Sequence, residues 1–219
     1  MPDYDPGMDL RSSLAFDWPA GSAFEREPDR RDPRRYSAHD KTRDGTFVRV
    51  RAIRPDDRER LIESFMRLST ASIRARWHGV KTAFTAGEIA GETAIDPDVH
   101  VGLVATVWIE GSEQIVGLAS FFVDPRSEPR RAEAAFTVLD DWQRRGIASL
   151  LFGHLARVAR RCGVDELYAI MRDPNPRMLR VFETSNLPLA IEREGAEIRV
   201  HADLRGLPVG RRTPVAAPA

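Results

Sequence analysis

Cysteine is almost absent from this chain of 219 residues, because Cys162 is the only one. That excludes a disulfide within the chain and a zinc site built from several cysteines, and it favours a reducing, cytoplasmic location. The histidines are scattered along the sequence with no HxH or HxxxH spacing. We therefore expect no bound metal.

Long apolar runs and an excess of one charge are also missing. No segment approaches the ~18 apolar residues that span a bilayer, and the N-terminal segment lacks the apolar core of a signal peptide. Acidic and basic residues number 33 each, whereas nucleic-acid affinity depends on an excess of Lys and Arg. We therefore expect neither a membrane nor a nucleic-acid partner. Lysine itself is scarce, with Lys41 and Lys81 alone among many arginines.

The chain does have one periodic domain between two irregular ends. Several prolines and a run of alternating charge predict that residues 1–35 form a mostly disordered arm. The arm could instead dock on the domain or on a partner through Phe16 and Trp18. Residues 36–206 form the predicted domain, and residues 207–219 are expected to be a flexible tail.

Hydrophobic patterns within the domain predict a mixed fold of class α/β (α+β). It has a mixed, mostly antiparallel central sheet and flanking helices. Asp44-Gly45 favours a hairpin turn, and the strand, long helix and strand over residues 132–171 predict one parallel strand pair. Strands are expected at 47–53, 100–108, 114–123, 132–139, 164–171, 189–193 and 197–204, and helices from 56, from 69 to 77, after 85, at 146–162 and at 175–185.

The segment richest in chemical information is FTVLDDWQRRGIASLL, residues 136–151, where a predicted strand leads through a loop into the long helix. Free N–H groups and the positive dipole end at a helix start form an anion site suited to phosphate. Gly146 lets an anion approach the backbone closely, and Arg144 and Arg145 add positive charge. The same Gln-x-x-Gly-x-Ala pattern occurs at 114–119, but there no helix follows the strand, so only the copy starting at Gln143 predicts such a site.

This segment and the order of elements around it resemble the GCN5-related N-acetyltransferase (GNAT) superfamily. The resemblance covers roughly residues 46–206 and also rests on Arg-Pro-Asp-Asp at 54–57, on the strand at 115–119 and on the helix at 175–183. The sequences at 187–189 and 193–195 further resemble the acetyltransferase domain of bacterial Pat-type protein-lysine acetyltransferases. The resemblance implies the GNAT fold, in which the two parallel strands splay apart to admit acetyl-CoA.

The resemblance also implies which residues bind acetyl-CoA, the cosubstrate, without any metal. The pantetheine arm would pair with the end of the strand, the pyrophosphate would bind the loop and first helical turn, and the late helix would face the pantetheine. These residues are Thr137, Val138 and Leu139 in the strand, Gln143, Arg144, Arg145, Gly146, Ile147, Ala148 and Ser149 in the loop and helix start, and Asn175 and Met178 in the late helix. Asn175 could equally be a plain helix N-cap, a role that Asn fills without a ligand.

Glu133 is the predicted general base, because acetyl transfer to an amine requires a group that removes a proton. It lies among small apolar residues in the strand, and in the Pat-type group a Glu at this position is the expected base; the alternative is a solvent-exposed edge-strand Glu. A backbone N–H near Leu139 would polarise the thioester carbonyl. Phe182 stands where many members carry a Tyr that protonates the leaving thiolate, so water would protonate it, or it would leave unassisted, or the protein would not catalyse.

The leading functional hypothesis is therefore an acetyl-CoA-dependent N-acetyltransferase that acts on lysine side chains of a protein partner, as a monomer or homodimer. A rival of the same class would acetylate a small-molecule amine. A rival of a different class is a non-catalytic acyl-CoA-binding sensor, which Phe182 would suit.

Overall fold

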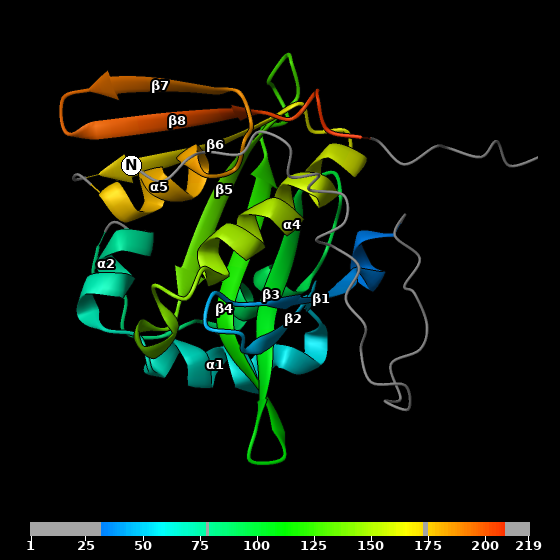
Figure 1. The fold of residues 1–219 in the computed structure, drawn as a ribbon, viewed down its shortest axis with the longest axis vertical. Helices are drawn as coiled ribbons and strands as arrows, with labels where there is room; N and C mark the ends of the chain where they lie inside the picture. Colours follow the sequence, from blue (N-terminus) through cyan, green and yellow to red (C-terminus); the bar gives the residue numbers. More distant parts are fainter. Residues whose placement is uncertain (1–31, 78, 173–174, 209–219) are drawn as a thin grey trace, which may run out of the picture.

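The computed structural model describes residues 32–77, 79–172 and 175–208, which form a twisted sheet with helices on both faces (Figure 1). The predicted arm and tail lie almost entirely outside the described residues. Within them, eight strands form one sheet in the order β1-β2-β3-β4-β5-β6-β8-β7. The strands are β1 (Ser37–Lys41), β2 (Phe47–Ala52), β3 (His100–Ile109), β4 (Ser112–Val123), β5 (Arg131–Val138), β6 (Glu166–Arg172), β7 (Leu189–Glu194) and β8 (Glu197–Asp203).

Neighbouring strands in this sheet are antiparallel except for β5 and β6, which are parallel as expected. Their pairing ends early, at Glu133 opposite Tyr168. Beyond that point β5 stays paired with β4 as far as Val138, and β6 stays paired with β8 as far as Arg172. The two strands therefore separate at their carboxyl ends, and the predicted fold class, with its splayed parallel pair, is confirmed.

Five helices pack on the sheet, and three short 3-10 turns connect elements in the described residues. The helices are α1 (Arg58–Met66), α2 (Thr70–Trp77), α3 (Ala86–Thr93), α4 (Ile147–Arg161) and α5 (Pro176–Glu183), and the 3-10 turns are Pro33–Arg35, Pro55–Asp57 and Asp140–Trp142. In Figure 1, α4 crosses one face of the sheet, whereas α1 lies on the opposite face.

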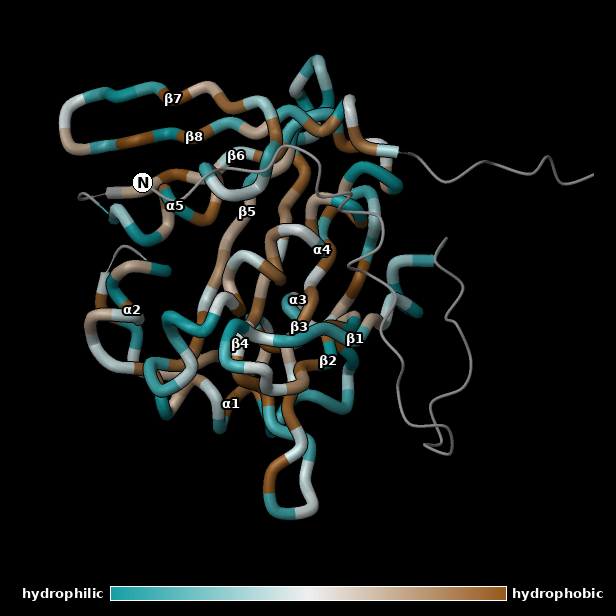
Figure 2. The backbone as a smooth tube through the Cα atoms, viewed as in Figure 1, coloured by the Kyte–Doolittle hydropathy of each residue, from teal (hydrophilic) through white to brown (hydrophobic). Residues whose placement is uncertain are grey.

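The main core lies between α4 and the central strands, where Figure 2 shows hydrophobic residues concentrated along β3, β4 and β5. Leu151, Leu155 and Val158 recur at helical spacing on α4 and are at most 2% exposed. Burial of each such side chain contributes about 1.5–3 kcal/mol. Gly163 follows the helix in a left-handed conformation with φ +82°, which is common just after a helix C-terminus.

A smaller apolar cluster forms on the opposite face, between α1 and β3–β4. Beside it, the rings of Phe65, Trp77 and Phe84 contact one another, with centroids 4.8–5.7 Å apart. We call these three residues the aromatic group. They join α1 to α2 and to the connection between α2 and α3.

The predicted hairpin turn is present: Gly45 has φ +85° and connects β1 to β2. The sequence pattern predicted β2 but not β1, which pairs with β2 over its full length. The first long helix also begins later than expected, at Arg58, because Pro55–Asp57 forms a 3-10 turn.

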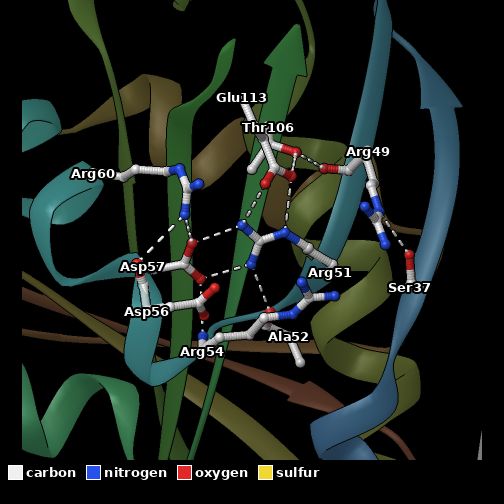
Figure 3. A network of polar contacts seen from close by, with 10 residues as sticks. All are labelled: Ser37, Arg49, Arg51, Ala52, Arg54, Asp56, Asp57, Arg60, Thr106 and Glu113. Carbon is white, nitrogen blue, oxygen red and sulfur yellow. Dashed lines mark hydrogen bonds and ion pairs between the residues drawn. The ribbon is translucent and has the colours of Figure 1, made fainter.

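A buried ionic network connects this helix start to the sheet (Figure 3). Arg51 of β2 donates to both carboxylate oxygens of Asp57 at 2.7 Å and to both of Glu113 at 2.9 and 3.0 Å. Thr106 also donates to Glu113 Oε1 at 2.8 Å, and Arg60 donates to Asp57 Oδ1 at 3.1 Å. Burial alone would raise the pKa of Asp57, but hydrogen bonding to Arg51 and the charge of Arg51 outweigh it and lower that pKa.

Candidate functional site

The site is the gap in which β5 and β6 separate. Backbone N–H groups along a strand point alternately to its two neighbours. The Leu139 N–H donates to Val116 O on β4 at 3.0 Å, so those of Val138 and Phe136 point toward β6. Because β5–β6 pairing has ended at Glu133, these two N–H groups face the gap. An extended ligand that contains amide groups can accept hydrogen bonds from them.

The same alternation corrects the prediction for Leu139. Its N–H is already bonded to Val116 O, and its side chain is buried at 3% exposure. It is therefore not free to polarise a thioester carbonyl or to pair with a ligand. Sequence could not reveal this, because it depends on which residues of β5 face β4.

The loop between β5 and α4 has the geometry of an anion site. Arg144 and Gly146 both have positive φ, at 65° and 90°, which curls the backbone so that successive N–H groups can converge. In the described part of the chain, no backbone hydrogen bond outside α4 is donated by residues 144–149, and the first N–H groups of a helix have no partner within it. They lie at the positive end of α4, so this loop fits a pyrophosphate. We call residues 143–146 the anion loop.

The arginines around this loop have different surroundings, and their contact with a ligand stays a prediction. Arg144 is exposed, but Arg145 stacks over the Trp142 ring at 4.6 Å and pairs with Asp44 of the β1–β2 turn at 3.2 Å. Arg43, which the sequence analysis did not single out, brings its side chain against Gly146. Ile147 is buried at 1% exposure and points into the core, while Ala148 and Ser149 stay partly exposed.

Gln143 and Asp140 hold this loop against α2. Gln143 Nε2 donates to Val138 O at 3.2 Å and to Ser72 Oγ at 3.1 Å. Asp140 accepts from the Ser69 N–H and hydroxyl at 2.9 and 2.8 Å and from the Ser72 hydroxyl at 2.9 Å. Gln143 thus has a structural role, and its contact with a ligand stays a prediction.

The late helix α5 borders the gap on the β6 side. Asn175 is its N-cap, because its Oδ1 accepts from the Met178 N–H at 3.1 Å. Its contact with pantetheine, and that of the partly buried Met178, stay predictions. Phe182 is fully buried, with its ring 4.5 Å from that of Phe152, and it carries no proton to donate.

Glu133 lies beside the point where the parallel pairing ends. Phe136 points toward α4, since its ring meets that of Phe152 at 5.8 Å, so Glu133 and Thr137 point to the opposite face of the sheet. Glu133 is half-buried between β4 and β6 and is not on an edge strand. The exposed-edge alternative is therefore wrong.

Two ionisable side chains share the surroundings of Glu133. Burial lowers the pKa of Arg76 on α2, although the charges of Glu92 and Glu133 oppose this. Burial and the charge of Glu133 raise the pKa of Tyr168. Tyr168, the cross-strand neighbour of Glu133, was missed because no sequence signal reveals which residue of β6 faces it.

An apolar pocket lies on this face between α1, α2, β4 and β5. It is lined by Leu61, Ser64 and the aromatic group, by residues 115–118 of β4, and by Thr137 and Leu139 of β5. The hydroxyl oxygen of Thr137 is buried and has no hydrogen-bond partner among the described residues. We call this space the apolar pocket.

The described residues contain no group of three or more His, Cys, Asp or Glu that could hold a metal ion. None of the helices in the described ranges is long and apolar enough to cross a bilayer.

Comparison with known proteins agrees with this geometry. The sequence model of the acetyltransferase (GNAT) family matches residues 59–186. An acetyltransferase of Pseudomonas aeruginosa is 31% identical over 135 residues, which make up 62% of this chain and 72% of that protein. The acetyltransferase Pat of Mycolicibacterium smegmatis is 30% identical over 141 residues, 64% of this chain but 41% of that protein.

The GNAT domain of S. lividans PAT is a similar solved structure. Its TM-score is 0.68 at 31% identity, over 76% of this chain and 96% of that domain. The matched family region contains β5, the anion loop and α4. With the splayed strands and the matched sequence in agreement, the chain belongs to the acetyltransferase (GNAT) family of acetyl-CoA-dependent enzymes.

Proposed function

We propose that this enzyme transfers the acetyl group of acetyl-CoA to lysine side chains of proteins, with Glu133 as general base. The observation that carries the proposal is the position of Glu133, which is half-buried beside the end of the β5–β6 pairing. The similarity to two proteins named Pat supports a protein substrate. The chain spans less than half of one of them, so the proposal concerns the acetyltransferase domain alone.

The transfer requires a neutral amine. Glu133 takes a proton from the lysine ammonium, and the amine nitrogen then attacks the thioester carbonyl carbon. A C–N bond forms and the C–S bond breaks, so that coenzyme A leaves as its thiolate. The nitrogen becomes positively charged as it adds to the carbonyl, and it releases its second proton to water. Phe182 cannot protonate that thiolate, so the proton comes from water.

The test is Glu133→Gln, with acetyl-CoA affinity and lysine acetylation both measured. We expect unchanged binding and a fall in kcat of about 100-fold or more, the usual effect of losing a general base. Glu63→Gln, at an exposed position on α1, is the matched control and should retain wild-type turnover. Wild-type turnover by Glu133→Gln would remove Glu133 as the base.

A second candidate is a non-catalytic acyl-CoA sensor, which the absence of a hydroxyl at Phe182 favours. It predicts that wild-type protein binds acetyl-CoA but acetylates no amine. Labelled acetyl-CoA incubated with a cell lysate, and separately with a panel of small amines, distinguishes the two hypotheses. Label on lysines of proteins supports the first, and label on small amines alone indicates a small-molecule acetyltransferase.

The proposed catalytic domain spans residues 36–206 and works in the cytoplasm. We place the start of the domain before residue 59, where the family match begins, because Arg43 and Asp44 of the β1–β2 turn contact the anion loop.

A further inference from the structure

We propose that Thr137 is a catalytic residue whose hydroxyl donates a hydrogen bond to the thioester carbonyl oxygen, while the acetyl methyl group occupies the apolar pocket. The inference rests on the proposed acetyl transfer. It assigns a role to a side chain that the resemblance placed only along the pantetheine arm.

The first support is the unpaired hydroxyl. Thr137 Oγ1 is buried, and none of the described residues bonds to it. A buried hydroxyl without a partner is costly, and such groups in native proteins call for an explanation such as a ligand or water. Because a Thr hydroxyl can both donate and accept, a carbonyl oxygen is a suitable partner.

The second support is the direction in which this side chain points. Thr137 lies on the same face of β5 as Glu133, since the two are an even number of residues apart. It also lines the apolar pocket at the end of β5. A thioester whose pantetheine arm paired with β5 would therefore bring its carbonyl to the side that carries both groups.

The third support is the chemistry of the apolar pocket. Its described lining residues include no charged side chain, and apart from Ser64 and Thr137 they are apolar or glycine. Such a lining favours a methyl group and disfavours a charged amine. The acyl group, and not the acceptor lysine, is thus the suitable occupant, and the aromatic group closes the space around it.

The fourth support concerns the donors at the end of β5. The N–H of Leu139 is bonded to Val116 O at 3.0 Å, so the Thr137 hydroxyl and the Val138 N–H, which faces the gap, remain as donors there. As the amine adds to the carbonyl carbon, negative charge develops on the carbonyl oxygen. A donor already in place stabilises that charge more than it stabilises the ground state. Thr137 keeps its proton throughout, and the C–N and C–S bond changes are those given above.

The test compares Thr137→Val, which removes the hydroxyl with little change of shape, with Thr137→Ser, which retains it. We expect kcat to fall on the order of 100-fold in Thr137→Val and to stay close to wild type in Thr137→Ser. Acetyl-CoA affinity should change little in either. Thr137→Val should also keep the wild-type Tm, because no protein hydrogen bond is lost.

Thr106→Val is the matched control. It removes a buried hydroxyl that does have a partner, Glu113. It should lower Tm by about 2–4 °C and leave kcat nearly unchanged. Thr137→Ala repeats the measurement should the valine variant fold poorly.

A spectroscopic readout makes the test independent of the acceptor. The carbonyl stretch of bound acetyl-CoA, isotopically labelled at the thioester carbon, should lie at lower frequency than in solution. That shift should persist in Thr137→Ser and disappear in Thr137→Val. An identical band in wild type and Thr137→Val would overturn the role of Thr137, as would wild-type protein that fails to bind acetyl-CoA.

If the shift depends on Thr137 but no lysine becomes acetylated, the inference stands and the proposed acceptor fails.

Discussion

The side chain of Arg43 covers Gly146: its Cγ lies 3.3 Å from where a Cβ at position 146 would stand. The backbone N–H of Arg43 also donates to Arg145 O at 2.9 Å. The β1–β2 turn therefore forms one wall of the anion loop and adds a positive charge there. Only glycine combines φ +90° with so close a neighbour.

The first prediction concerns this contact. Gly146→Ala should destabilise the protein by about 1–2 kcal/mol, because the left-handed conformation is strained for alanine. It should also weaken acetyl-CoA binding about 10-fold or more, equivalent to about 1.4 kcal/mol, because the new Cβ displaces Arg43.

Gly163→Ala is the control, since Gly163 has φ +82° but no atom near its Cβ position. It should show a similar loss of stability with unchanged acetyl-CoA affinity. Titration calorimetry and thermal unfolding measure both quantities. Equal affinities in the two variants would show that the contact with Arg43 is irrelevant to binding.

The second prediction concerns the attachment of α2. Asp140→Ala removes the acceptor for Ser69 and Ser72 at the start of that helix. Loss of these hydrogen bonds to a charged acceptor costs about 1–2 kcal/mol. Because α2 carries Trp77 of the aromatic group, kcat/KM should fall as well. Thermal unfolding and steady-state kinetics test this, with the exposed neighbour in Asp141→Ala as control. Equal effects in both variants would refute the role of Asp140 in holding α2.

The third prediction concerns the buried pair Arg51–Asp57, whose side chains are 1% and 0% exposed. Asp57→Asn should lower the free energy of unfolding by about 3 kcal/mol or more, because it leaves Arg51 buried with less compensating charge. Asp56→Asn changes an exposed neighbour and should stay within about 0.5 kcal/mol of wild type. Urea denaturation measures the difference, and similar values for both variants would contradict the role of the network.

The fourth prediction is a pH dependence from Glu113. Burial opposes ionisation, but hydrogen bonds and charge from Arg51 lower the pKa of Glu113 from 4.5 to about 2. A group with a lowered folded-state pKa stabilises the protein fully above its unfolded pKa, and that stability is lost as the pH falls through the folded pKa. The stability gap between wild type and Glu113→Gln should therefore be constant above pH 4.5 and shrink as the pH falls to about 2. A gap that widened on acidification would contradict this assignment.

Features determined by neighbouring residues were predictable from the sequence. Thr85 and Glu88, three residues apart at the start of α3, form a capping box, and Gly45 and Gly163 adopt left-handed conformations, which glycine favours. The loop starting at Gln143 was distinguishable from its copy at 114–119 because only one precedes a helix. Local signals of this kind were sufficient to predict the sheet apart from β1, its parallel strand pair and the position of the anion loop.

Features determined by distant segments were not predictable. Asp140 accepts hydrogen bonds from Ser69, which lies 71 positions earlier at the start of α2, and no local pattern marks that partnership. The predicted role of Leu139 was wrong because backbone N–H groups alternate in direction along β5. The N–H of Leu139 faces β4, whereas that of Val138 faces the gap. The unpaired hydroxyl of Thr137 could be recognised only once its whole surroundings were known.

The contact between the β1–β2 turn and the anion loop also affects the order of folding. Asp44 and Arg145, which form an ion pair there, are 101 residues apart, whereas the loop and α4 are contiguous in sequence. Closing so long a chain segment is slower than forming a local turn and helix. During refolding, the protein should therefore regain acetyl-CoA binding later than helical structure, because the β1–β2 turn with Arg43 packs against the anion loop last.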